Sequence, residues 1–116
     1  MNIYISGKIG SDTITEPIRR KFAKAQAFLE SLGYKVTNPV SSEEQAIFRE
    51  FDETLDKVYT GKDSYAHHLF YDISSLMYCD AIFMLSDYKD SPGARAELAF
   101  AQAIGMEVVY QDGLFE

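Results

Sequence analysis

The chain has 116 residues, of which 47% are hydrophobic and 25% charged, and its formal net charge is −7 at pH 7. This length and composition are typical of one folded domain, residues 1–116, and argue against a disordered chain. The acidic balance argues against a nucleic-acid polymer or a membrane surface as partner, because both require clustered Lys and Arg. The densest basic run lies in a helical pattern beside acidic residues and predicts a solvated helix face, formed by Arg19, Arg20, Lys21 and Lys24.

Nothing in the sequence pattern indicates secretion or membrane insertion. The chain begins directly with a strand-forming run, without the basic and apolar segments of a signal peptide. No apolar stretch approaches the roughly 20 residues that a membrane span needs. Cys79 is the only cysteine, which excludes an intrachain disulfide and a cysteine metal cluster, and we expect it to be a small buried residue. The expected localisation is cytoplasmic.

Strand-forming and helix-forming segments alternate along the chain. The predicted strands are residues 3–6, 34–38, 80–85 and 107–110, and the predicted helices are residues 15–33, 41–57, 66–77 and 91–105. Local signals support these limits: Pro17 lies near the first turn of the first helix, and Ser91 and Pro92 are predicted as the N-cap and first residue of the last. Residues 60–64 interrupt the pattern between the second and third helices.

The alternation of strands and helices predicts an α/β fold with a parallel sheet and right-handed crossovers. We expect a flavodoxin-like three-layer sandwich with four or five strands in the order 2-1-3-4. In such sheets ligands bind outside the carboxyl ends of the strands, where the strand order reverses. The candidate ligand loops are therefore residues 7–13 and 86–93, which follow the first and third strands.

The last predicted helix carries the strongest functional signal. Its interior is almost entirely apolar, with only Arg95, Glu97 and Gln102 as polar residues. At about 100° per residue, Arg95 and Gln102 share the solvent side, whereas Glu97 falls on the opposite, dry side, among Ala94, Ala101 and Ile104. A carboxylate on a dry face must be paired, protonated or next to a cavity. Glu97 is therefore either a structurally paired residue or part of a ligand site.

Three other residues are candidates for the same site. The helix over residues 66–77 has a predicted apolar face formed by Leu69, Phe70, Ile73, Leu76 and Met77. Asp72 lies at the border of this face, and two converging carboxylates are typical of glycosyl chemistry. Asp90 lies in the loop before the last helix, where it can meet a leaving group; an exposed loop residue is the alternative. Tyr4, on the first strand, can donate a hydrogen bond to a carboxylate, with simple core packing as the alternative.

Two further patterns limit the cofactor chemistry. Gly7-x-x-Gly10 matches neither the dinucleotide-binding fingerprint nor the P-loop, so it does not support a redox cofactor or ATP. Its backbone N–H groups can still approach a hydroxyl or a phosphate. His67 and His68 are adjacent, so on a helix their side chains diverge by about 100° and cannot chelate one ion. We expect no metal and no cofactor.

Three segments together point to a known family. Residues 3–7 read Ile-Tyr-Ile-Ser-Gly, and Asp72-x-x-x-Leu76 is followed by Cys79-Asp80-Ala81. The last helix and the loop before it contain Asp90-Ser91-x-Gly93-x-x-x-Glu97-x-x-x-Ala101. In this order they resemble the first strand and glycine turn, the acid-bearing helix, and the nucleophile helix of the nucleoside 2-deoxyribosyltransferase-like superfamily. The Ser-x-Gly-x-x-x-Glu spacing is also similar to that of the 2′-deoxynucleoside 5′-monophosphate N-glycosidases.

The resemblance implies an enzyme of glycosyl transfer or hydrolysis at C1′ of a 2′-deoxynucleoside or deoxynucleotide. Glu97 would attack C1′ and form a glycosyl-enzyme ester, and Tyr4 would position Glu97. Asp72 would bind or orient the sugar or base, and Asp90 would assist departure of the base. Ser91 would contact the 5′ end, and the other expected substrate-binding residues are Ser6, Gly7, Lys8 and Gly93. The implied partner is a small-molecule nucleoside or nucleotide, and the implied assembly is a homo-oligomer.

The chain also departs from the family pattern. Residues 41–64 have no clear counterpart and lie where a lid or a substrate-selective wall is expected. Residues 111–116 are short and unlike the transferase C-termini that complete a neighbouring subunit's site, and Arg95 stands where the family often has small residues. The alternatives to an enzyme are a non-catalytic nucleotide-binding module with the same pocket, and an α/β domain whose acidic residues are structural.

Overall fold

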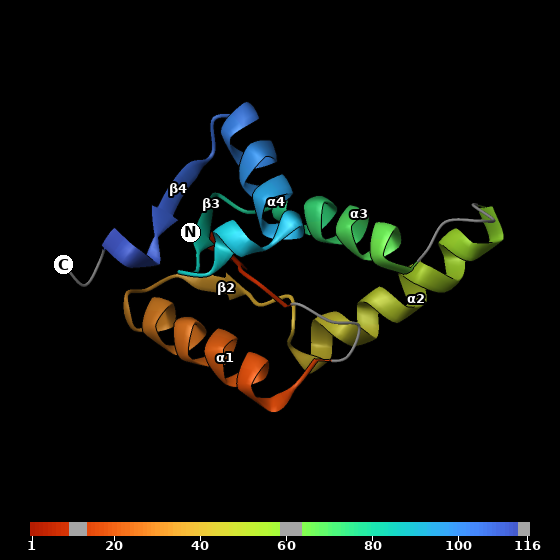
Figure 1. Cartoon of the computed structure of the whole chain (residues 1–116), viewed down its shortest axis with the longest axis horizontal. Coiled ribbons are helices and arrows are strands. Elements are labelled where there is room, and N and C mark those ends of the chain that lie inside the picture. The colour runs from red at the N-terminus through yellow and green to blue at the C-terminus, as the bar shows by residue number, and fades with distance from the viewer. Residues whose placement is uncertain (10–13, 59–63, 114–116) are drawn as a thin grey trace.

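The computed structural model describes residues 1–9, 14–58 and 64–113, with the backbone alone described at 51–58 and 64–65. Its elements, shown in Figure 1, are β1 (Asn2–Ser6), α1 (Glu16–Ser31), β2 (Lys35–Thr37), α2 (Ser42–Val58), α3 (Ser64–Leu76), β3 (Ala81–Met84), the 3-10 turn η1 (Tyr88–Asp90), α4 (Pro92–Ala103), β4 (Glu107–Tyr110) and the 3-10 turn η2 (Gln111–Gly113). Every predicted strand and helix is present, and their ends differ from the prediction by at most two residues.

The differences at the helix ends have local causes. Gly33 and Gly105 have positive φ angles of 94° and 75°, a conformation that ends a helix before the glycine. Helices α1 and α4 therefore stop short of the predicted ends. Ser64, predicted as part of a break, is already helical, and the rest of that break lies outside the described residues.

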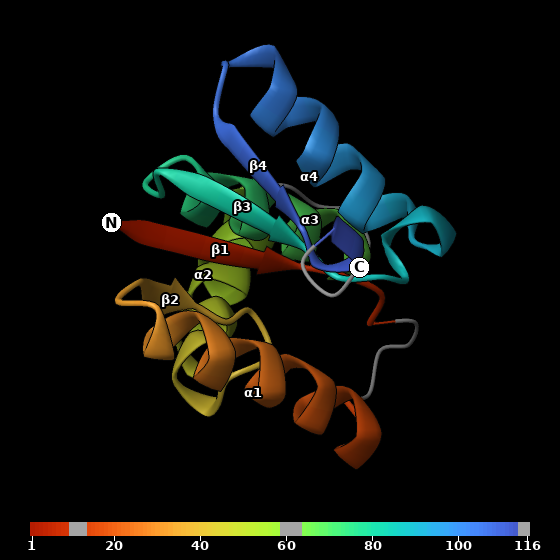
Figure 2. The same ribbon diagram turned by 90° about the vertical axis from the view of Figure 1, so that its left-hand side faces the viewer.

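The four strands form one parallel sheet in the order β2-β1-β3-β4, which confirms the predicted topology. Figure 2 shows the strands pointing the same way, with α1 and α4 at opposite sides of the sheet. All carboxyl ends of the strands therefore lie at one edge, and the strand order reverses between β1 and β3. This edge is where the loops after β1 and β3 leave the sheet.

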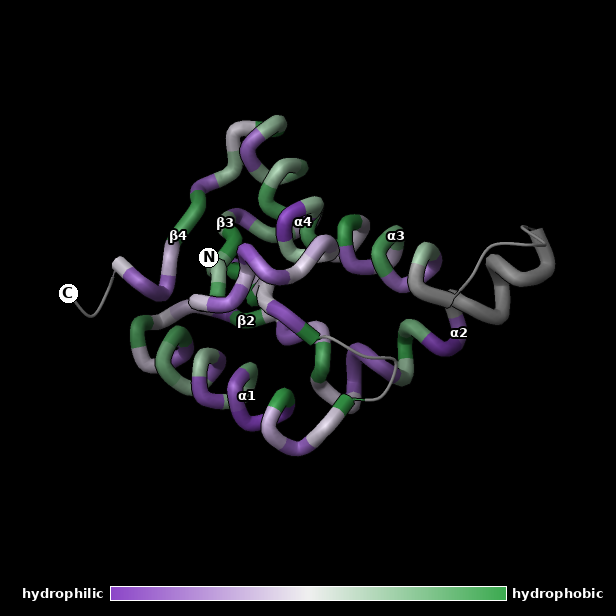
Figure 3. Tube along the Cα trace, viewed as in Figure 1, coloured by the Kyte–Doolittle hydropathy of each residue, from purple (hydrophilic) through white to green (hydrophobic). Residues whose placement is uncertain are grey.

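The core has two layers, one on each face of the sheet. Alternate residues of β1 point to opposite faces, so Ile3 and Ile5 pack with the buried face of α1, whereas Tyr4 packs with α3 and α4. Figure 3 shows the same pattern as hydrophobic strands and a helix α1 in which hydrophobic and hydrophilic residues alternate. The result is the predicted three-layer sandwich. Among the described residues, no helix has the length and apolar character to cross a membrane.

Helix α2 lies within residues 41–64, the region without a family counterpart. It packs along α3, and Figure 1 shows the pair extending away from the sheet. Phe48 of α2 stacks on the ring of His68, with the ring centroids 4.3 Å apart. The Tyr71 hydroxyl donates to Glu44 Oε2 at 2.7 Å, and burial raises the pKa of this tyrosine to about 12. The first part of this region is thus a packed helix, and its role as a lid or wall stays a prediction.

Gly7 ends β1 at a position where a side chain does not fit. A Cβ there would lie 2.5 Å from Leu85 Cδ1 and 2.9 Å from Leu85 Cβ. Leu85 is fully buried, and its backbone N–H donates to the Ser6 carbonyl at 2.8 Å, which holds the two loops together. Close packing of the loops after β1 and β3 therefore explains this glycine without any ligand.

Gly7→Ala is expected to destabilise the protein by roughly 1–3 kcal/mol, because the buried Leu85 side chain must leave its position. Urea unfolding measures the change. Gly113→Ala is the matched control, since nothing lies within 4 Å of a Cβ built at that residue. Equal stability of Gly7→Ala and the wild type would show that Leu85 can repack at no cost.

Candidate active site

Glu97 is a buried carboxylate held by two hydroxyl groups of β1. The side chain, 5% exposed, extends from α4 toward the sheet. The Tyr4 hydroxyl donates to Oε2 at 2.5 Å, and the Ser6 hydroxyl donates to Oε1 at 2.8 Å. Tyr4 and Ser6 face the same side of the sheet because they are two residues apart on one strand. Both carboxylate oxygens therefore have a fixed partner.

One of the three residues predicted to lie beside Glu97 on the buried side of α4 is exposed instead. Ala94 and Ala101 are buried on the same side of α4, as expected. Ile104, predicted to be their neighbour, is 53% exposed. It is the C-cap residue of α4, so the helical periodicity used to place it has already ended.

Burial dominates the protonation of this site. It raises the pKa of Glu97 to about 7, although the hydrogen bonds from Tyr4 and Ser6 lower it and offset part of the effect. Burial and the negative charges of Glu97 and Asp72 raise the pKa of Tyr4 well above its ordinary value, so this phenol remains a donor. Glu97 thus ionises near neutral pH between two hydroxyl donors.

Asp72 belongs to the same electrostatic cluster. It is 8% exposed and lies deeper than predicted, whereas Phe70 and Met77, expected on the buried face of α3, are 59% and 55% exposed. The reason is that α3 packs between α2 and α4, so its buried side is set by these two helices rather than by its most apolar stripe. Burial, followed by the charges of Glu97 and Glu44, raises the pKa of Asp72 well above its usual range.

Tyr4→Phe is expected to raise the pKa of Glu97 by roughly one unit, because it removes a hydrogen bond to the charged form and keeps the ring in the core. Carbon-13 NMR of the glutamate side-chain carboxyls measures this titration. Tyr34→Phe is the control, since Tyr34 packs on the opposite face of the sheet. An unchanged pKa in Tyr4→Phe would mean that the hydroxyl does not interact with the ionised carboxylate.

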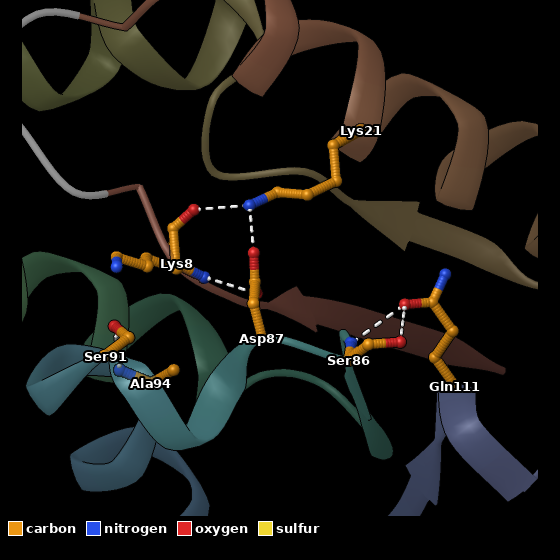
Figure 4. Close-up of polar contacts among 7 residues, drawn as sticks. All are labelled: Lys8, Lys21, Ser86, Asp87, Ser91, Ala94 and Gln111. Carbon is orange, nitrogen blue, oxygen red and sulfur yellow. Dashed lines mark hydrogen bonds and ion pairs between the residues drawn. The ribbon is translucent and has the colours of Figure 1, made fainter.

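The loops after β1 and β3 meet in a second polar cluster, shown in Figure 4. The backbone N–H of Lys8 donates to Asp87 Oδ1 at 3.0 Å, and Lys21 Nζ donates to Asp87 Oδ2 at 2.5 Å and to the Lys8 carbonyl at 2.6 Å. Beside it, Ser86 donates through its backbone N–H and its hydroxyl to Gln111 Oε1, at 2.8 and 2.9 Å. The carboxyl ends of β1 and β3 are thus joined by polar contacts.

Lys21 corrects the prediction of a solvated basic face. Arg19, Arg20 and Lys24 are exposed, but Lys21 is half-buried and paired. It directly precedes Phe22, a fully buried core residue, so it stands at the edge of the buried face of α1. The helical periodicity around Phe22 is the signal that could have identified it.

The remaining predicted residues lie around the N-terminus of α4. The Ser91 hydroxyl accepts from the Ala94 backbone N–H at 3.1 Å, which confirms the predicted N-cap. Gly93 follows in the first turn and is half-buried. Asp90 is exposed on η1, and its backbone N–H donates to the Asp87 carbonyl at 3.1 Å. Its role in departure of the base stays a prediction.

Sequence reasoning missed one neighbour of Asp72 and misjudged Cys79. His68 Nε2 lies 3.6 Å from Asp72 Oδ2, a pair whose i, i+4 spacing was visible in the sequence. Cys79 is half-buried in the turn before β3, with Sγ 3.7 Å from Thr37 Oγ1, and burial raises its pKa. Within residues 1–9, 14–58 and 64–113, no three His, Cys, Asp or Glu side chains are grouped to hold a metal ion.

The fold and the buried site define a flavodoxin-like α/β protein with a carboxylate held at the end of its first strand. The chain belongs to the DUF4406 family, a domain of unknown function whose model matches residues 1–110. It is similar in structure to the CMP N-glycosidase BcmB of Clostridium botulinum, with a TM-score of 0.52 over 95% of this chain and 67% of that one. At 17% identity this likeness shows the fold. A search of curated proteins found no significant match.

Proposed function

We propose that this protein catalyses glycosyl transfer or hydrolysis at C1′ of a nucleoside or nucleotide, with Glu97 as the nucleophile. The observation that carries the proposal is the buried Glu97 carboxylate, aligned by Tyr4 and Ser6 at the end of β1. A side chain held in this way costs stability and is typical of a functional site. The glycosidase named above has the same fold, and its reaction supports this class of chemistry.

The proposed reaction has two displacements. An oxygen of Glu97 forms a bond to C1′ while the C1′–N bond breaks and its electron pair leaves with the base. Water or a second base then forms a bond to C1′ while the C1′–O ester bond breaks and returns its electron pair to the Glu97 carboxylate. The attacking group loses a proton and the departed base gains one, which gives hydrolysis or transfer. The transition state has oxocarbenium character, so the nearby negative charge stabilises it. The hydroxyl groups of Tyr4 and Ser6 orient the attacking oxygen and oppose its protonation.

Asp72 has a different proposed role because its environment differs. Glu97 has two hydroxyl donors, whereas the charges of Glu97 and Glu44 both act against ionisation of Asp72. We therefore assign the first ionisation of the pair to Glu97, while Asp72 keeps its proton. A protonated Asp72 donates a hydrogen bond to the sugar or base. Asp90 and Ser91, on the loop before α4, are proposed to assist departure of the base and to contact the 5′ end.

The test is base release by the purified protein, followed by liquid chromatography. Ribonucleosides, 2′-deoxynucleosides and their 5′-monophosphates are tested separately, because the comparison enzyme is named for CMP, a ribonucleotide. Release that requires an acceptor base indicates a transferase, and release without one indicates a hydrolase. Mass spectrometry is expected to find a glycosyl adduct on Glu97. If calorimetry detects nucleotide binding but no base is released, the protein is a nucleotide-binding module and not an enzyme of this class. If neither binding nor base release is detected, both hypotheses are rejected.

A further inference from the structure

The polar cluster at the ends of β1 and β3 has the form of an occupied anion site. One backbone N–H, from Lys8, and one ammonium group, from Lys21, converge on the two oxygens of Asp87. A backbone N–H and a lysine are donors that commonly bind phosphate. The side chains of Lys21 and Asp87 are each 31% exposed, so solutes can reach the cluster.

This cluster lies close to the proposed nucleophile. Ser6, which donates to Glu97, is two residues before Lys8, so the two Cα atoms are at most about 7 Å apart. Asp87 lies just beyond the end of β3, the strand paired with β1. Ser6 is in register with Met84 of β3, and the Ser6 carbonyl accepts a hydrogen bond from the Leu85 N–H, so Asp87 also lies near Ser6. The Cα atoms of Ser6, which holds Glu97, and of Lys8, which holds Asp87, are thus separated by no more than about the span of a nucleotide sugar and its 5′-phosphate. A sugar bound at Glu97 can therefore place its 5′ end here.

We propose that Asp87 is a specificity-determining residue that fills this anion site and selects a nucleoside with an uncharged 5′ end over its 5′-monophosphate. The inference rests on the proposed function of Glu97. A phosphate must break both contacts of Asp87 and approach its negative charge, whereas a 5′-hydroxyl can bind beside the intact cluster. Among the described contacts, Lys21 supplies the only ammonium group that binds the Asp87 carboxylate. Its positive charge is already neutralised by Asp87 and does not attract a phosphate.

The experiment compares kcat/KM for a nucleoside and for its 5′-monophosphate. The wild type is expected to prefer the nucleoside. Asp87→Asn removes the charge and keeps the shape, and Asp87→Ser also opens the space. Both should raise the relative use of the monophosphate, Asp87→Ser by about tenfold or more, because Lys8 N–H and Lys21 become available to phosphate. Adding Lys21→Met to Asp87→Ser should cancel the gain.

A wild type that prefers the monophosphate, or a preference unchanged in both Asp87 variants, overturns the inference. Inorganic phosphate supplies a readout that needs no activity. Its titration should shift the NMR signal of the Lys8 amide in Asp87→Ser, but not in the wild type or in Asp87→Ser combined with Lys21→Met. An equal shift in the wild type, or no shift in Asp87→Ser, also overturns it. Absence of base release from every substrate rejects the proposed function alone, because the phosphate titration still tests the anion site.

Discussion

Glu97→Gln lowers base release by roughly a thousandfold or more if Glu97 is the nucleophile, since a neutral amide oxygen is too weak to attack C1′. The substitution preserves the size of the side chain. Its amide can still exchange hydrogen bonds with the hydroxyl groups of Tyr4 and Ser6. The loss is therefore chemical. Chromatography of the released base measures the rate, and mass spectrometry should find the glycosyl adduct in the wild type only.

Glu107→Gln is the matched control for this experiment. It makes the same chemical change at the exposed first residue of β4. Its rate of base release should stay within about twofold of the wild type, as for most exposed substitutions. A Glu97→Gln variant that releases base at the wild-type rate contradicts the assignment of the nucleophile. Circular dichroism of both variants separates a chemical loss from a loss of folded protein.

The buried carboxyl of Glu97 is expected to lower the free energy of unfolding by about 3 kcal/mol between about pH 4 and about pH 8. Its pKa is about 7 in the folded protein, against an ordinary value of 4.5. Between these values the folded state binds more protons than the unfolded state, so stability decreases as the pH rises. Below the ordinary value both states are protonated and the penalty disappears. Asp72, whose pKa burial also raises, adds a contribution of the same sign.

Urea unfolding at a series of pH values tests this dependence. Glu97→Gln removes the ionisable group, so the variant should be more stable than the wild type at about pH 8 and nearly equal to it at about pH 4. Glu107→Gln should keep the wild-type dependence. A wild type that becomes more stable over this range, or a Glu97→Gln variant that is less stable at the upper end, contradicts the raised pKa. Holding the Glu97 carboxylate away from water thus lowers the free energy of unfolding at neutral and higher pH.

Much of the fold follows from local patterns. The strands alternate with helices at their characteristic periods, and Ser91 and Pro92 mark the start of α4 where the structure has it. The order β2-β1-β3-β4 is the one expected for a flavodoxin-like sheet, although the pattern alone does not fix it. The dry side of α4 was equally visible, because a single acid among alanines on a helix face is a short-range signal. Glu97 is accordingly buried.

The placement of Asp72 was harder to predict. The most apolar stripe predicted for α3 includes Phe70, yet Phe70 is exposed while Asp72 is buried. Met77, also predicted on that stripe, follows the last residue of α3 and is exposed. The face of a helix that is buried depends on the elements that pack against it, and both α2 and α4 pack on α3. Periodicity within one helix does not contain that information. For Lys21, periodicity could have indicated its place at the edge of the buried face of α1, but not its partner Asp87, which is 66 residues away.

The sequence by itself therefore determined the elements and the single acid on the dry side of α4, because each depends on contacts between near neighbours in the chain. The strand order was expected from the α/β pattern, but it is fixed by long-range pairings such as that of Ile3 with Ala81. Only the tertiary structure decided which groups meet. The Tyr4 hydroxyl reaches Glu97 across 93 residues, and Asp87 closes on Lys8 across 79. Such contacts depend on how whole layers pack, a long-range property that no local pattern of residues records.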